Sequence, residues 1–209
     1  MGQSRIFSFM KLSLALLSFI FVGCGTVDLE IRQSNTNIGM QPRSVAILPF
    51  TLEEQVHEDV SPNDLFRDCF YNYFSFLGYV DLPLEIINDK LIQAGLTDNK
   101  KILELSPARL RKILGVDAVI RGRVLSANNF TGGIHAETSI KAKIDMLDIR
   151  TGDILWETEH KESTYSGILS PTIVEIIQDQ MENVKVHQAY FRTAEIFSIS
   201  MMKEIPDPA

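Results

Sequence analysis

The stretch Ser44-Val45-Ala46-Ile47-Leu48-Pro49-Phe50 decides the fold of this chain. Its side chains are apolar at every position from Val45 to Leu48, and Pro49 then closes the run. A strand that is apolar at each position, rather than at every second one, is buried on both faces, as in a sheet with helices on each side. The sequence therefore predicts an α/β protein whose first core strand lies between two helical layers.

Helices and short connections are expected after this strand. Ser61-Pro62 and Asp64 supply an N-cap, a proline at the first helical position and an acid in the first turn, so a helix should begin there and end at Gly78. Its buried face should consist of side chains at helical spacing: Phe66, Cys69, Phe70, Tyr73, Phe74 and Leu77. We then expect a short strand at 79–84, helices at 85–94 and 108–114, and a polar loop at 97–101.

The next segment reads as an antiparallel meander of three strands. The strands should cover 118–130, a segment around Ile140 to Met146, and 154–159, with turns at Thr131-Gly132-Gly133 and Thr151-Gly152-Asp153. Apolar and charged residues alternate along them, so one face should be buried and the other solvated. The expected inward residues are Ile120, Gly122, Val124, Ile140, Ala142, Ile144, Met146, Ile154 and Trp156.

The charged face of this meander is expected to carry basic strands beside an acidic strand. Arg121, Arg123, Lys141 and Lys143 should stand near Asp145, Glu157 and Glu159. Opposite charges on neighbouring strands support pairing by a few tenths of a kcal/mol.

A helical region should close the domain, between Ser170-Pro171 and Pro206. Its apolar stripe is predicted to begin with Ile173, Ile176, Ile177, Gln180 and Met181. It should continue with Phe191, Ala194, Phe197, Met201 and Met202. The pattern does not decide between one helix and two.

The N-terminus has the pattern of a secretory signal. Arg5 and Lys11 precede an apolar run over 12–22, which is too short to span a bilayer. The segment ends at Phe21-Val22-Gly23-Cys24, which resembles the lipobox of bacterial lipoproteins. That resemblance implies lipidation of Cys24 and, because Gly25 rather than Asp follows it, an outer-membrane anchor facing the periplasm. An ordinary signal peptide is the alternative.

Three segments are thus expected: a signal peptide at 1–23, a lipidated tether at 24–43 and an α/β domain at 44–205. Within the tether, Val27 to Ile31 alternates and could pair as an edge strand, which would shorten its reach.

Composition limits the partners of the mature chain. From Cys24 onward there are 18 basic and 27 acidic side chains, a net charge of −9, since Arg5 and Lys11 lie in the signal. An acidic protein is a poor ligand for nucleic acid or anionic lipid surfaces. With Cys24 lipidated, Cys69 has no partner for an internal disulfide, and its place on a helical apolar face favours a core role.

No constellation in the sequence indicates catalysis, a metal or a cofactor. His57, His135 and His160 lack partners at zinc spacing and read as solvated loop or edge residues. Asp145, Asp148 and Asp153 do not match a calcium loop. The candidate partner surface is basic: Arg109, Arg111, Lys112, Arg121, Arg123, Lys141 and Lys143.

Several of these stretches together resemble a known group of lipoproteins. "SVAILPF", "LGVDAVIRGRV" and "DIRTGDILWE", behind a lipobox and before a long C-terminal helix, are similar to lipoproteins related to the TolB amino-terminal domain, the CsgG secretion channel and the LpoB synthase activator. The resemblance is nearest to uncharacterised bacterial lipoproteins of this fold. It implies a three-layer α/β sandwich with a mixed sheet, a buried N-terminal strand, a C-terminal antiparallel meander and a long C-terminal helix.

The resemblance suggests a non-catalytic accessory or structural subunit of an export or envelope-assembly complex. Its expected partners are the membrane, through the lipid, and envelope proteins such as a CsgG-type channel lipoprotein or further copies of itself. Two alternatives stay open. One is an LpoB-like regulator of peptidoglycan synthesis, against which the short tether counts. The other is an envelope hydrolase that uses His57 or His160 with nearby acids.

Overall fold

A mixed β-sheet is the centre of the computed structural model, which describes residues 30–33, 42–54, 60–132, 135–167, 178–205 and 208. Within these ranges seven strands form the sheet, in the order β1-β7-β6-β5-β2-β4, with β3 beside β5. The strands are β1 (Glu30–Gln33), β2 (Ser44–Ile47), β3 (Thr51–Leu52), β4 (Val80–Asp81), β5 (Ala118–Gly132), β6 (His135–Asp148) and β7 (Ile154–Gly167). The pairs of β2 with β4 and β5 and of β3 with β5 are parallel, whereas β5, β6, β7 and β1 pair antiparallel.

The stretch from Ser44 to Phe50 lies between two separate cores, as its sequence predicts. Val45 and Ile47 belong to one core, and Ala46 and Leu48 belong to the core on the opposite face. Each of the four is at most 1% exposed. Strand alternation places successive side chains on opposite faces, so β2 supplies both cores at once.

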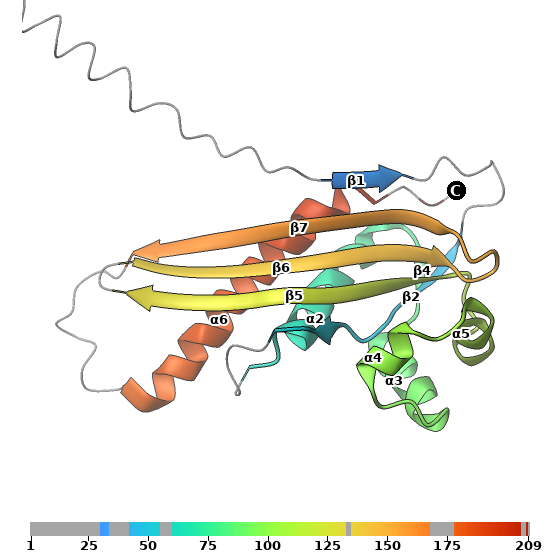
Figure 1. Cartoon of the computed structure of the whole chain (residues 1–209), viewed down its shortest axis with the longest axis horizontal. Helices are drawn as coiled ribbons and strands as arrows, with labels where there is room; N and C mark the ends of the chain where they lie inside the picture. The colour runs from blue at the N-terminus through green and yellow to red at the C-terminus, as the bar shows by residue number, and fades with distance from the viewer. Residues whose placement is uncertain are drawn as a thin grey trace, which may run out of the picture.

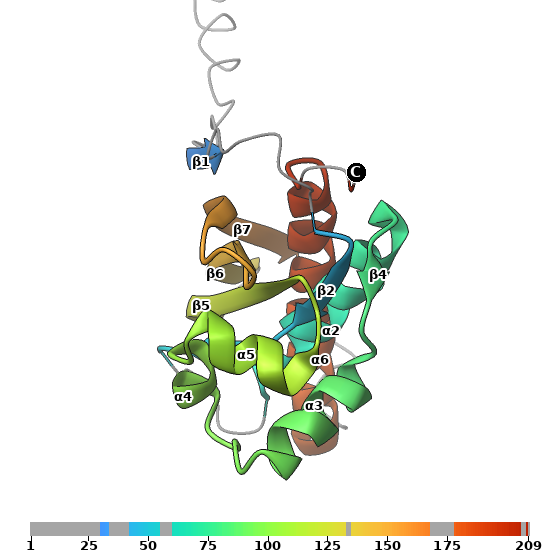
Figure 2. The ribbon, with the colours of Figure 1, turned by 90° about the vertical axis from the view of Figure 1, so that its right-hand side faces the viewer.

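Helices cover the two faces unequally (Figures 1 and 2). Helices α2 (Pro62–Phe74) and α6 (Gln178–Met202) lie across one face, where the larger core forms. Helices α3 (Leu84–Gln93), α4 (Asn99–Leu103) and α5 (Pro107–Leu114) lie on the other face at the β2 end. The three-layer α/β architecture is therefore confirmed, and these three helices leave the outer face of the long β5–β7 meander uncovered.

The larger core is built from aromatic rings that α2 and α6 bring together over β2 and β5. The ring centroids of Phe66 and Phe197 are 4.6 Å apart, and those of Phe50 and Phe66 are 5.5 Å apart. The Phe50 ring lies directly on Gly122, where any Cβ atom would overlap it. Gly122 is thus the point on β5 where the sheet leaves room for Phe50.

Cys69 is part of this core, as expected. Its side chain is 2% exposed, and burial raises the pKa of its thiol to about 12. A thiol with so high a pKa is almost entirely protonated at neutral pH and is chemically inert there.

Several expectations about the helices and strands are corrected. The segment expected as a polar loop at 97–101 forms the start of α4, because the Asp98 side chain accepts hydrogen bonds from the N–H groups of Lys100 and Lys101. Helix α2 ends in a 3-10 turn, η1 (Ser75–Leu77), before Gly78. The third meander strand continues past Glu159 to Gly167. The pattern left the number of C-terminal helices open, and the described part of that region forms one helix, from Gln178 to Met202.

Two predicted inward side chains lie outward instead. Ile154 is 39% exposed, because a register shift between Met146 and Leu147 displaces the start of β7. Phe191 is 46% exposed, and Tyr190 and Thr193 occupy the buried face of α6 in its place. Ala194, Phe197 and Met201 are fully buried, as predicted. The signal segment, Cys24, His57, and the 170–177 start of the final helical region lie outside the described residues.

Candidate functional site

The uncovered face of the meander carries the predicted charged residues. Strand alternation turns Arg121 and Arg123 on β5 and Lys141, Lys143 and Asp145 on β6 away from α6. Glu157 and Glu159 on β7 point to the same side. This set of seven side chains is called the charged face below.

Most cations on the charged face are already paired with an acid. Lys141 Nζ lies 2.7 Å from Glu159 Oε1, and Lys143 Nζ lies 3.0 Å from Glu157 Oε1. Both pairs join β6 to β7, as the expectation of basic strands beside an acidic one requires. Pairs of this kind contribute about 0.2–1 kcal/mol each, because solvent screens them. They support strand pairing and neutralise the face at the same time.

Arg121 and Asp145 form the most buried of these pairs. Arg121 donates from Nε at 2.8 Å and from Nη2 at 2.7 Å to the same Asp145 oxygen. Asp145 is 3% exposed, and this burial raises the pKa of its carboxyl group, against the opposing effect of Arg121. The pair fixes two strands at the floor of a hollow rather than offering a free charge to a ligand.

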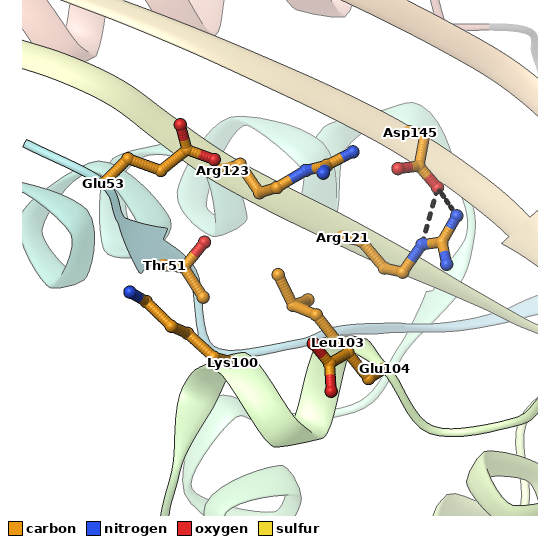
Figure 3. A pocket seen from close by; sticks show the side chains of 8 residues that line it. All are labelled: Thr51, Glu53, Lys100, Leu103, Glu104, Arg121, Arg123 and Asp145. Atoms are coloured by element: carbon orange, nitrogen blue, oxygen red, sulfur yellow. Dashed lines mark hydrogen bonds and ion pairs between the residues drawn. The ribbon is translucent and has the colours of Figure 1, made fainter.

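That hollow lies between α4 and the charged face (Figure 3). It has a volume of about 400 Å³ and is lined by Thr51, Glu53, Lys100, Leu103, Glu104, Arg121, Arg123 and Asp145. Among the described residues, no ion pair joins Arg123 to an acid. The lining carries charges of both signs and one threonine hydroxyl, and it holds no histidine, cysteine or serine.

Helix α5 holds the other predicted basic residues. The Ser106 side chain caps its first turn, accepting from the Arg109 N–H at 3.4 Å, and Leu110 and Leu114 bury its inner face. Arg109, Arg111 and Lys112 are therefore exposed on the outer side. Because α5 packs on the same side of the sheet as the charged face, all seven predicted basic residues lie on one side of the sheet.

A shallow hollow beside α5 contains cations and no acid. It has a volume of about 570 Å³ and is lined by Ser106, Pro107, Ala108, Arg111, Lys112, Ile149, Arg150, Thr151 and Gly152. Arg150 is held by Asp148, through Nε at 3.0 Å and Nη2 at 2.6 Å. The exposed cations of this hollow, Arg111 and Lys112, make α5 the most basic part of the predicted partner surface, whose binding role stays a prediction.

His160 corrects the expectation of a solvated edge residue. It is 5% exposed, because it lies two residues beyond the buried Thr158 on the inner face of β7, beneath α6. Its Nε2 atom is 3.3 Å from Glu162 Oε2, and its ring packs edge-on against Phe197 with centroids 5.0 Å apart. The side chain of His135 is outside the description, and His57 lies wholly outside it. Across the described residues, no cluster of three metal-ligating side chains occurs.

Two polar residues that the sequence did not single out prove structurally important. Arg67 on α2 is 6% exposed and donates to the carbonyl of Ile47. Asp117 accepts hydrogen bonds from the N–H groups of Arg43 and Ser44. The sequence offered one signal for Arg67, which is a charged residue next to Phe66 in a helix that is otherwise apolar on this side. Nothing in the sequence indicates that the Ile47 carbonyl would be its acceptor.

The fold and the site together define an α/β domain with one charged sheet face. Among the described residues, no helix is long and apolar enough to cross a membrane. Residues 37–205 match the family described as "Putative lipoprotein GNA1162-like", and the chain belongs to this family. This bears out the lipoprotein part of the resemblance, whereas the TolB and CsgG part stays a prediction.

Individual relatives agree with this assignment. The chain is 27% identical over 118 residues to "Putative lipoprotein NMB1124/NMB1162" of Neisseria meningitidis serogroup B, and the match spans 54% of each protein, about half the length of that relative. It is similar to the crystal structure of lipoprotein GNA1162 from Neisseria meningitidis, with a TM-score of 0.54, 24% identity, and coverage of 63% of this chain and 88% of that one.

A more distant similarity is to the LpoB C-terminal domain from Escherichia coli. Its TM-score is 0.39 and its identity 12%, with coverage of 59% of this chain and 84% of that one. The similarity to the GNA1162 structure, at 24% identity, describes a fold and does not transfer a function.

Proposed function

We propose that this protein is a lipid-anchored, non-catalytic lipoprotein of the outer membrane that faces the periplasm and serves an export or envelope-assembly complex as an accessory or structural subunit. Cys24 carries the lipid, and the side of the sheet that holds α5 and the charged face binds a protein partner. Membership of a lipoprotein family supports the anchor. The hollow beside α4, whose lining is rich in charges of both signs and holds no histidine, cysteine or serine, supports a binding role.

The observation that carries this proposal is the pairing of β1 with β7. Glu30, only six residues after Cys24, lies in register with Glu159. Six residues reach at most about 20 Å when fully extended. A domain held so close to its anchor suits a complex at the membrane surface, whereas an LpoB-like activator must reach through the peptidoglycan layer.

The basic surface of α5 fits a partner with an acidic surface. Arg109, Arg111 and Lys112 stand together on an overall acidic chain, so they form a local region of opposite sign. Complementary charge of this kind raises association rates and selects among partners.

Crosslinking in intact cells tests this proposal. A photo-reactive residue replaces Lys112 in the full-length chain, and a matched one replaces exposed Arg192 on α6, which packs on the opposite face of the sheet, as the control. We expect position 112, and not position 192, to capture an envelope protein or a second copy. Reversing the charge at Arg111 should then reduce that capture.

The outcome also decides between the alternatives. Capture of a peptidoglycan synthase would replace the proposal with the LpoB-like regulator. Equal capture at both positions, or at neither, would contradict a partner surface at α5.

The lipid anchor is tested separately. Cys24→Ser should release a folded protein from the outer-membrane fraction, and retention of that variant would overturn the lipid anchor. Loss of cellular function on alanine substitution of His57 or His160 in a protein that still folds would favour the hydrolase.

A further inference from the structure

Two large apolar side chains project into solvent at one corner of the domain. Phe76, in η1, is 86% exposed, and Val80, the first residue of β4, is 69% exposed. Their neighbours Phe74 and Tyr79 are at most 6% exposed and fill the core. The fold therefore uses the aromatic residues on either side of Phe76 and leaves Phe76 itself in water, where it is the most exposed of the large apolar side chains among the described residues.

The backbone of this corner is held in a defined conformation. The Ser75 hydroxyl lies 3.0 Å from the Tyr71 carbonyl oxygen and 2.7 Å from an Asp81 carboxylate oxygen, so it joins the two ends of the turn. Gly78 closes η1 with a φ of 85°, a conformation that glycine adopts without strain. Phe76 is thus presented on a fixed turn rather than on a mobile loop.

The corner lies beside the first residue of β2, at the edge of the sheet opposite to β1. The Val80 N–H donates to the Arg43 carbonyl at 2.9 Å, and Val80 pairs with Ser44, the first residue of β2. Figure 2 shows β1, β4 and the C-terminal end of α6 toward one end of the molecule, and α3, α4 and α5 at the opposite end. The apolar corner and the strand nearest to Cys24 therefore face the same way.

The short distance between Cys24 and β1 limits what can lie on that side. Because Glu30 is fixed on β7, the lipid on Cys24 holds the bilayer within about 20 Å of β1. An apolar residue on the same side is then within reach of the membrane surface, where phenylalanine inserts favourably among headgroups and acyl chains.

We infer that the Phe76–Val80 corner contacts the lipid bilayer and orients the domain on it, so that α5 and the charged face point away from the membrane. This inference rests on the proposed lipid anchor. It assigns the exposed apolar side chains of this corner, Phe76 and Val80, to contact with lipid.

Fluorescence quenching by lipids tests the contact in the full-length lipidated protein. Phe76→Cys receives a polarity-sensitive thiol dye, and only this position should react, since Cys69 is buried with a pKa of about 12 and Cys24 carries the lipid. The matched control is Ile92→Cys on α3, which is 60% exposed and lies at the opposite end. Each protein is reconstituted into phosphatidylethanolamine and phosphatidylglycerol vesicles that contain lipids with nitroxide-labelled acyl chains.

We expect the dye at position 76 to shift its emission to shorter wavelength and to be quenched by the nitroxide lipids, while the dye at position 92 behaves as in water. Equal behaviour at the two positions, in protein that floats with the vesicles, would overturn the contact and leave the anchor intact. Protein that does not float with the vesicles would contradict the anchor, and with it this inference.

Discussion

At the scale of single residues, Arg67 replaces a missing strand. The Val45 carbonyl accepts from the Leu82 N–H at 3.0 Å, on the β4 side of β2. The Ile47 carbonyl points the same way two residues later, where β4 has already ended. Arg67 donates to it from Nε at 3.2 Å and from Nη2 at 2.8 Å, and to Asn88 from Nη1 at 2.9 Å. Burial lowers the pKa of this guanidinium to about 10, so it still carries its charge at neutral pH.

Replacing Arg67 by methionine should therefore destabilise the domain. The change preserves much of the apolar stem but leaves the buried Ile47 carbonyl without its donors, which costs about 1–3 kcal/mol. Urea unfolding followed by circular dichroism measures the loss. Arg109→Met, on the exposed side of α5, is the matched control and should change stability by less than about 0.5 kcal/mol. Equal stabilities of the two variants would show that the hydrogen bonds from Arg67 to the Ile47 carbonyl do not stabilise the fold.

Asp117 gives a prediction about pH. Burial alone would raise the pKa of its carboxyl group, but the N–H groups of Ser44 and Arg43, at 3.1 and 3.0 Å, outweigh burial and hold the pKa below its ordinary value. A carboxylate with a lowered pKa in the folded state stabilises the fold at pH values above its unfolded pKa of about 3.9. That contribution disappears as the pH falls through the lower, folded pKa.

Asp117→Asn should consequently be less stable than the natural chain at neutral pH, and the difference should shrink as the pH falls below about 4. Urea unfolding at a series of pH values, with the natural chain beside the variant, measures the difference directly. A difference that stays constant across this range would mean that the ionised form of Asp117 has no special role at the junction of β2 and β5.

At the scale of elements, local patterns predicted those parts of the fold that a short window determines. The continuous apolar run of β2, the Ser-Pro start of α2 and the alternation in β5–β7 all produced the expected elements. The charged pairs on the sheet could be anticipated for the same reason, since alternation puts β6 lysines and β7 acids on one face.

The features that were not predicted depend on distant contacts. Helix α4 has only five residues, and the amide of its first residue, Asn99, donates to the Phe50 carbonyl, a contact that no local pattern reveals. The register shift at Met146 and Leu147 exposes Ile154, and the packing of α6 selects Tyr190 over Phe191. The hollow beside α4 requires the placement of α4 next to β3 and β5, so the sequence alone could not indicate it.

The seam between β7 and α6 contains buried polar atoms of two kinds. Thr158 Oγ1 and Tyr190 Oη are buried and have no hydrogen-bond partner within the described structure. Thr164, farther along the same strand, instead shares a hydrogen bond of 2.6 Å with Thr193 on α6. The inner face of β7 therefore carries one threonine whose hydroxyl is hydrogen-bonded, Thr164, and one whose hydroxyl has no partner, Thr158.

The same substitution at these two positions should act in opposite directions. Thr158→Val removes a buried hydroxyl that lacks a partner and should stabilise the domain by about 1 kcal/mol, whereas Thr164→Val breaks a hydrogen bond and should destabilise it by about 1 kcal/mol. Thermal unfolding of both variants against the natural chain measures the two signs. Destabilisation by Thr158→Val would indicate that this hydroxyl has a partner in solution.

At the scale of the whole molecule, one short strand determines how the domain stands relative to its anchor. Residues Glu30–Gln33 pair with Trp156–Glu159, so β1 attaches the tether to the outer edge of the sheet. Without this pairing, the chain between Cys24 and Pro42 would reach about 60 Å instead of about 20 Å. The proposed surface complex and the proposed lipid contact both depend on the shorter distance.

Ile31→Pro and, separately, Arg32→Pro should release β1, because proline removes a backbone N–H and fits poorly into a paired strand. Since β1 is a four-residue edge strand, the rest of the sheet should remain folded. Amide hydrogen exchange of Trp156 to Glu159 should then become faster in at least one variant, with no change in β5. Ile31→Val, which keeps the N–H, is the control.

In the lipidated protein the released tether should also weaken quenching of the dye at position 76 by the nitroxide lipids. Faster exchange without weaker quenching would mean that the corner reaches the membrane independently of β1, whereas unchanged exchange in both proline variants would contradict the pairing itself.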